Sequence, residues 1–181
     1  MLCHFSALLW IKLVQGEPGE MAWISHATLL LAGVALILES TRLAAISFAN
    51  VAGVHALWIF DAIVGSTTGA FPVGVTNYVA TCDVSTFAAT LHHAYLAPIL
   101  FWWLWARGRL EVGDSWRALF GGTIGMTVLC LLSRLLLPAS INANVAHTLF
   151  ADSTVSAFRW YNGLPWWRYL AIHVPVWSIV F

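Results

Sequence analysis

The sequence predicts an all-α fold: a polytopic membrane helix bundle with about five transmembrane helices and an N-terminal interfacial helix. Two observations lead to this fold class. Of the 181 residues, 60% are hydrophobic and only 9% are charged, whereas soluble domains carry about 25% charged residues. The hydrophobic residues also gather in long uncharged runs, which suit helices that cross a hydrocarbon layer of about 30 Å.

The clearest of these runs extends from Val84 to Ala106 and contains no Lys, Arg, Asp or Glu. Its length of about 23 residues is enough for a helix to cross the membrane. Two adjacent histidines, His92 and His93, lie about a third of the way along it. An ionisable residue at membrane depth is costly, so its presence predicts a functional site.

The other elements follow from the same alternation of apolar runs and helix-breaking residues. Residues 1–14 are too short to span and are interpreted as an interfacial helix, which a Gly- and Pro-containing turn ends. Membrane helices are then predicted over residues 22–38, 43–64, 84–106, 116–137 and 166–181. The expected organisation is an interfacial helix and turn over 1–20 and a single transmembrane bundle over 21–181.

The charges of the loops orient this bundle. The loop over residues 65–82 has no Lys or Arg, whereas Arg107, Arg109 and Arg117 surround the next loop. Loops rich in basic residues stay on the cytoplasmic side. The loops over 65–82 and 138–165 are therefore expected on the outer side.

With this orientation, histidines from three helices fall at one depth. His55 lies about ten residues inside the outer end of its helix, His92 and His93 about nine, and His173 about seven. At 1.5 Å per residue, all four are within roughly 5 Å of a common level. We therefore predict that His55, His92, His93 and His173 bind a cofactor. Successive helical residues diverge by about 100°, so His92 and His93 are expected to serve different partners.

Two acidic residues and one arginine lie near the same layer. Asp61 and Asp83 are predicted either to join His55, His92 and His93 in a metal site or to support the ligating imidazoles. The alternative is a structural ion pair between Arg134 and one of these carboxylates, because buried charges persist by pairing.

Several chemistries fit such a layer. Imidazoles ligate haem or another tetrapyrrole, and they also bind a divalent metal such as Zn²⁺. A relay that passes protons or ions is a third possibility. Any one of these histidines also has a structural alternative as the partner of a backbone carbonyl near Pro98 or Pro175. His4, His26 and His147 are interpreted as interfacial or solvated residues without a role.

The function that these patterns favour is a metal- or tetrapyrrole-binding integral membrane protein, surrounded by the lipid bilayer, alone or with partner subunits of a larger membrane complex. A membrane-embedded enzyme acting on a lipid or isoprenoid headgroup and a purely structural membrane subunit are the alternatives. Eight basic and eight acidic residues cancel, which removes the electrostatic case for nucleic acid. The sequence contains no HExxH, GxSxG or P-loop motif, so whether the chain is an enzyme stays open.

Four short segments carry a resemblance to known proteins. They are Gly16-Glu17-Pro18-Gly19, His55-x-x-Trp58-x-x-Asp61, the stretch from His92 to Pro98, and Ile141-Asn142-Ala143-Asn144. Together they resemble a group of uncharacterised bacterial multi-pass membrane proteins. The resemblance implies a location in the bacterial inner membrane and a shared purpose for His55, Asp61 and His92. It implies no activity.

Overall fold

The computed structural model describes residues 1–107, 112–149 and 156–180, and this part of the chain is all-α, with no β-strand. Arg109 and Phe181, which the sequence analysis placed in a loop and at a helix end, lie outside the described residues. The α-helices are α1 (Leu2–Val14), α2 (Ile24–Ile37), α3 (Thr41–Thr68), α4 (Val84–Thr90), α5 (His92–Ala106), α6 (Val112–Leu136), α7 (Ser156–Asn162) and α8 (Trp166–Val180). Three short 3-10 helices join them, η1 (Pro18–Ala22), η2 (Asn77–Ala80) and η3 (Ala143–Val145).

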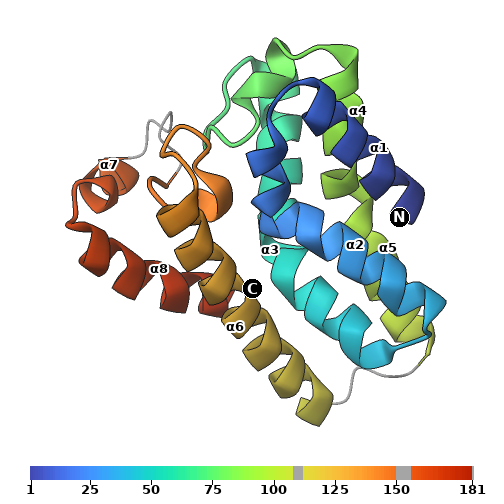
Figure 1. Ribbon diagram of the computed structural model, residues 1–181. Helices are drawn as coiled ribbons and strands as arrows, with labels where there is room; N and C mark the ends of the chain where they lie inside the picture. The colour runs from blue at the N-terminus through green and yellow to red at the C-terminus, as the bar shows by residue number, and fades with distance from the viewer. Residues whose placement is uncertain (108–111, 150–155, 181) are drawn as a thin grey trace.

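Helix α3 is the centre of the arrangement and packs against α2, α5 and α6 (Figure 1). Helix α1 lies over α2 and α4, and α8 packs against α6. Buried residues of α1 to α5 form one hydrophobic core, made of Leu8, Leu29, Ala32, Ala35, Ala44, Val51, Ala89, Leu96, Ala97, Leu100 and Leu104. A second, smaller core joins α6, α7 and α8 through Cys130, Ala146, Tyr161, Tyr169 and Leu170.

The sequence of α3 explains both its ends and its buried face. Ser40 caps the start, where its Oγ accepts a hydrogen bond from the backbone N–H of Leu43 (3.3 Å). Gly69 ends the helix with a left-handed φ of 74°, which glycine adopts without steric cost. The buried residues between these ends recur every three or four positions: Ala44, Ser47, Val51, His55, Trp58, Asp61 and Gly65. One face of α3 therefore turns His55, Trp58 and Asp61 inward.

Two of the described helices are long and apolar enough to cross a membrane, α3 and the 116–136 part of α6, each with a mean hydropathy of 1.7. The five predicted spans are therefore not confirmed. Helix α2 has only 14 residues, which is about 21 Å at 1.5 Å per residue. The predicted helix over 84–106 is divided into α4, with 7 residues, and α5, with 15.

The division between α4 and α5 falls at Leu91. The backbone N–H groups of Leu91 and Ala94 donate to the carbonyls of Ala88 (3.3 Å) and Leu91 (3.0 Å), each three residues earlier. Such tighter bonds replace the regular α-helical pattern at this point. The break lies directly before His92 and His93, which begin α5.

The described parts of the connection over residues 138–165 contain two helices that the sequence did not indicate, η3 and α7. Buried Asn144 holds η3 in place: its Oδ1 accepts from the N–H of Ile24 (2.5 Å), and its Nδ2 donates to the carbonyl of Ala22 (2.8 Å) and to Ser133 Oγ (3.0 Å). This side chain thereby ties the start of α2 to α6.

Candidate metal centre

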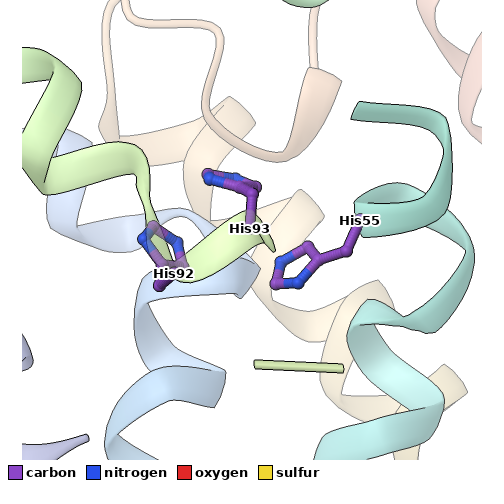
Figure 2. A group of neighbouring side chains, drawn as sticks. All are labelled: His55, His92 and His93. Atoms are coloured by element: carbon purple, nitrogen blue, oxygen red, sulfur yellow. The ribbon is translucent and has the colours of Figure 1, made fainter. Parts of the chain in front are cut away.

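Three histidines converge between α3 and α5. His55 comes from α3, and His92 and His93 come from the first turn of α5; Figure 2 shows their rings facing one another. Ring centroids are 4.1 Å apart for His92 and His93, 4.7 Å for His55 and His93, and 5.8 Å for His55 and His92. One ring nitrogen from each residue lies within 4.8 Å of the other two. We call His55, His92 and His93 the imidazole triad.

Backbone carbonyls fix which ring nitrogens of His92 and His93 carry a proton. Nδ1 of His92 lies 2.9 Å from the carbonyl oxygen of Ala89, and Nδ1 of His93 lies 2.9 Å from that of Thr90. A carbonyl oxygen only accepts, so each Nδ1 is the donor and the lone pair of each neutral ring is on Nε2. Metal-binding histidines characteristically donate their other ring N–H in this way, which orients the ring.

Three of the four remaining ring nitrogens of the triad are buried without a hydrogen-bond partner among the described residues. They are Nε2 of His92 and both ring nitrogens of His55. Both residues are 0% exposed, so bulk solvent does not reach these nitrogens. Buried polar atoms are rarely left unpaired, because the unpaired group loses its hydration without compensation. A metal ion would accept the lone pair of His92 Nε2 and the one lone pair of the neutral His55 ring.

An aromatic side chain confines the third imidazole of the triad. The indole of Trp58, one turn after His55 on α3, stacks on the ring of His93 at 5.2 Å between centroids and 16° between planes. Trp58 Nε1 in turn donates to the hydroxyl of Tyr78 (2.9 Å). The same face of α3 thus supplies the candidate ligand His55 and the indole of Trp58, on which the candidate ligand His93 stacks.

A fourth histidine, His26 of α2, lies beside the triad, at 5.2 Å between its ring centroid and that of His92. Its Nδ1 is 2.8 Å from the carbonyl oxygen of Glu20. A fifth, His4 of α1, lies 5.7 Å from His92. Neither residue was expected to have a role, since both are near the ends of apolar runs and nothing in their spacing signals tertiary contact.

His4 is already occupied by hydrogen bonds. Its Nε2 is 3.1 Å from the carbonyl oxygen of Ala89, and its Nδ1 accepts from the hydroxyl of Tyr95 at 2.6 Å. The carbonyl of Ala89 therefore accepts from both His4 and His92. His4 helps to position His92 through this shared oxygen and has no nitrogen left for a ligand.

His173 does not join the triad, contrary to the prediction from depth. Its Nε2 lies 3.3 Å from the carbonyl oxygen of Asn144, and its ring stacks on Tyr169 at 5.3 Å. The physical reason is that α8 packs against α6, within the second core, whereas the triad lies between α3 and α5 (Figure 1). Equal depth along separate helices therefore did not bring His173 to the other rings.

Asp61 is buried but serves a loop instead of a metal. Its Oδ1 accepts from the backbone N–H groups of Val73 (2.8 Å) and Gly74 (3.3 Å). Its Oδ2 accepts from the N–H and the hydroxyl of Thr76, both at 2.9 Å. Both oxygens are thus engaged in holding the loop after α3, and Asp61 is not a member of the triad's group of ligand atoms.

Asp83 caps a helix. Its carboxylate accepts from Ser85 Oγ (2.6 Å) and from the backbone N–H of Thr86 (2.7 Å), and these hydrogen bonds hold its pKa below the ordinary value. As the N-cap of α4 it stabilises the helix that carries Ala89 and Thr90. Asp83 therefore supports the histidines only through the backbone of α4.

The ion pair expected for Arg134 does not form. Its guanidinium donates to the carbonyl of Ala146 (2.7 Å) and lies over the ring of Trp166, at 5.8 Å from the centroid. The carboxylates of Asp61 and Asp83 instead accept hydrogen bonds from neighbouring residues. The ion pairs among the described residues are Lys12 with Glu17, Lys12 with Glu20, and Arg107 with Glu39.

Comparison with known proteins adds no assignment: no family model matches the sequence, and no curated protein or solved structure matches the chain. The geometry of the imidazole triad therefore has to carry the functional conclusion.

The dimensions of the triad suit a single ion. Nitrogen ligands lie about 2.0–2.1 Å from Zn²⁺, which separates them from one another by roughly 3.3–3.6 Å. The triad's nitrogens lie within 4.8 Å of one another, so side-chain rotations that move each by about an ångström would close the site on an ion of this size.

Proposed function

We propose that this chain is an integral membrane protein that binds one transition-metal ion at the imidazole triad. The observation that carries the proposal is the set of buried, unpartnered ring nitrogens on His55 and His92, next to His93 with its Nε2 lone pair. Imidazole is a ligand for zinc, copper, iron and nickel, whereas calcium and magnesium require oxygen ligands. The class of ion proposed is therefore a nitrogen-binding transition metal.

The close convergence of the rings favours a bare ion over a tetrapyrrole. A haem is a flat plate whose axial ligands approach from opposite faces. The three triad rings instead lie 4.1–5.8 Å from one another, and His26 lies against His92 from the side of α2. These neighbours fill the space that a macrocycle requires.

Location in a membrane is supported by the surface as well as by α3 and α6. Large apolar side chains on α5 and α6 are more than 60% exposed, namely Trp102, Trp105, Trp116, Phe120, Leu135 and Leu136. Exposed large apolar side chains of this kind suit lipid or a membrane partner subunit. Multi-pass insertion into a bacterial inner membrane, which the resemblance of the sequence implies, belongs to the same proposal.

The test is the metal content of the full chain, purified in detergent from its native membrane and measured by elemental mass spectrometry. We expect about one ion per chain, and its loss in His55→Ala, His92→Ala and His93→Ala. His147→Ala, which alters a histidine outside the triad, is the matched control and should retain the ion. Folded wild-type protein that neither contains nor takes up a transition metal would contradict the proposal.

A further inference from the structure

The donor set of the triad carries no charge. Each ring is neutral when it offers a lone pair, and within the described residues no carboxylate or thiolate joins the group of ligand atoms. Both carboxylate oxygens of Asp61, on the same helix as His55, accept hydrogen bonds from the backbone of the loop after α3. An ion in the triad would therefore keep its full charge.

The charged groups nearest to His26 pair with one another, and this cluster of one ammonium and two carboxylates has a net charge of −1. Beyond His26, on the side of η1, the ammonium of Lys12 pairs with the carboxylates of Glu20 (2.5 Å) and Glu17 (3.2 Å). Glu20 faces His26 with its backbone carbonyl, because that oxygen is the acceptor for His26 Nδ1. Neither acid turns toward the triad as a counter-ion.

The site is mostly buried, with His93 half-buried. His55 and His92 are 0% exposed, and Trp58 covers His93. The cost of moving an ion from water into such an interior rises with the square of its charge, so it is about four times larger for a dication than for a monocation of equal size. A buried site with three neutral donors therefore penalises Zn²⁺ far more than a singly charged ion.

The number of ligands in the triad also favours a singly charged ion over Zn²⁺. Zn²⁺ sites are almost always four-coordinate, with water or hydroxide as the fourth ligand when the protein supplies three. Cu⁺, with a filled d shell, is satisfied by three nitrogen ligands in a plane and needs neither a fourth ligand nor a counter-ion. Among the ions that imidazole binds, Cu⁺ is the singly charged one.

We propose that the imidazole triad is selective for Cu⁺ over Zn²⁺ and holds it in three-coordinate, all-nitrogen form. This inference rests on the proposed metal-binding function and specifies its ion. It involves binding only, with copper entering and leaving as Cu⁺.

The test is anaerobic competition on the full chain in detergent, with bicinchoninate as the Cu⁺ competitor and a colorimetric chelator for Zn²⁺. We expect one Cu⁺ per chain, retained when Zn²⁺ is added in roughly tenfold excess, and lost in His55→Ala. His147→Ala should bind as the wild type does. X-ray absorption of Cu⁺-loaded wild-type protein should show three nitrogen neighbours and no sulfur, a readout that depends on no variant.

The outcomes separate the two proposals. Displacement of Cu⁺ by equimolar Zn²⁺, a copper–sulfur distance in the absorption spectrum, or a stable Cu²⁺ form with an electron paramagnetic resonance signal would overturn copper(I) selectivity. Displacement by Zn²⁺ or a stable Cu²⁺ form would still leave the triad as a metal centre. A copper–sulfur distance would instead place the copper at a cysteine. Failure of wild-type protein to bind any of these ions would overturn both proposals.

Discussion

The indole of Trp58 lies nearly parallel to the imidazole of His93, at 16° between their planes, and hydrogen-bonds through Nε1 to the hydroxyl of Tyr78. His93 is thereby held on two sides: its Nδ1 is anchored to the carbonyl of Thr90 and its face to the indole. A ligand whose ring is fixed before the ion arrives loses less side-chain entropy on binding.

Replacement of Trp58 by Leu should weaken metal binding about tenfold, in the range found when groups that orient metal ligands are removed. This substitution removes the indole that stacks on His93 and leaves the three histidines of the triad unchanged. Chelator competition on the detergent-purified chain measures the change. Trp58→Phe keeps a ring against His93 but cannot donate to Tyr78, so its affinity for the metal should lie between the affinities of Trp58→Leu and wild type. Equal affinity in Trp58→Leu and wild type would show that stacking does not position His93.

Replacement of Asp61 by Asn should destabilise the fold by about 2–3 kcal/mol, because an NH₂ group would face backbone donors in place of an accepting oxygen. The loop that contains Val73 and Thr76 would lose its anchor on α3. Thermal unfolding in detergent measures this loss. Metal bound per folded chain should be unchanged, and loss of metal from fully folded Asp61→Asn would instead make Asp61 part of the site.

The stability of α4 should depend on pH, because the carboxylate of Asp83 caps this helix. Hydrogen bonds from Ser85 and Thr86 place the pKa of its carboxyl below the ordinary value in the folded chain. The stabilisation is therefore complete above the pKa of the unfolded chain, near 3.8, and is lost as the pH falls through the lower, folded value. Asp83→Ala should accordingly raise amide exchange in α4 at neutral pH and change it little in strong acid. An equal effect at both pH values would contradict this account.

Metal should stabilise the folded chain through the triad. An ion at 100 times its dissociation constant adds about 2.7 kcal/mol to the free energy of unfolding, which corresponds to an increase in Tm of roughly 5–10 °C for a chain of this size. Scanning calorimetry with and without ion measures the increase. His55→Ala should unfold at one temperature in both conditions, whereas His147→Ala should show the full difference.

Composition and apolar runs were enough to predict an all-helical fold and the positions of its long helices, since hydropathy and helix-breaking residues act locally. They did not predict the break at Leu91. We expected His92 and His93 to serve different partners, but their ring centroids are 4.1 Å apart and both rings lie near His55. Rings of adjacent residues can reach one group of neighbours although their Cα–Cβ bonds diverge along the helix.

The candidate site was predicted in part. His55, His92 and His93 come together, but His173 packs in the second core, because helix-to-helix packing is not encoded in the depth of a residue along its own helix. His26 was overlooked for the same reason: only the tertiary packing of α2 brings it to His92. The roles of Asp61 and Asp83 were not predicted, because most of their hydrogen-bond partners are backbone N–H groups, which residue types do not identify.

One oxygen atom connects the N-terminal helix to the centre of the molecule: the carbonyl of Ala89 accepts from His4 of α1 as well as from His92. A neighbouring subunit, a bulky detergent or a fused tag that displaces α1 would remove one of the two donors to this oxygen and loosen the orientation of His92. If the imidazole triad holds an ion as proposed, preparations that disturb the first helix should contain less metal.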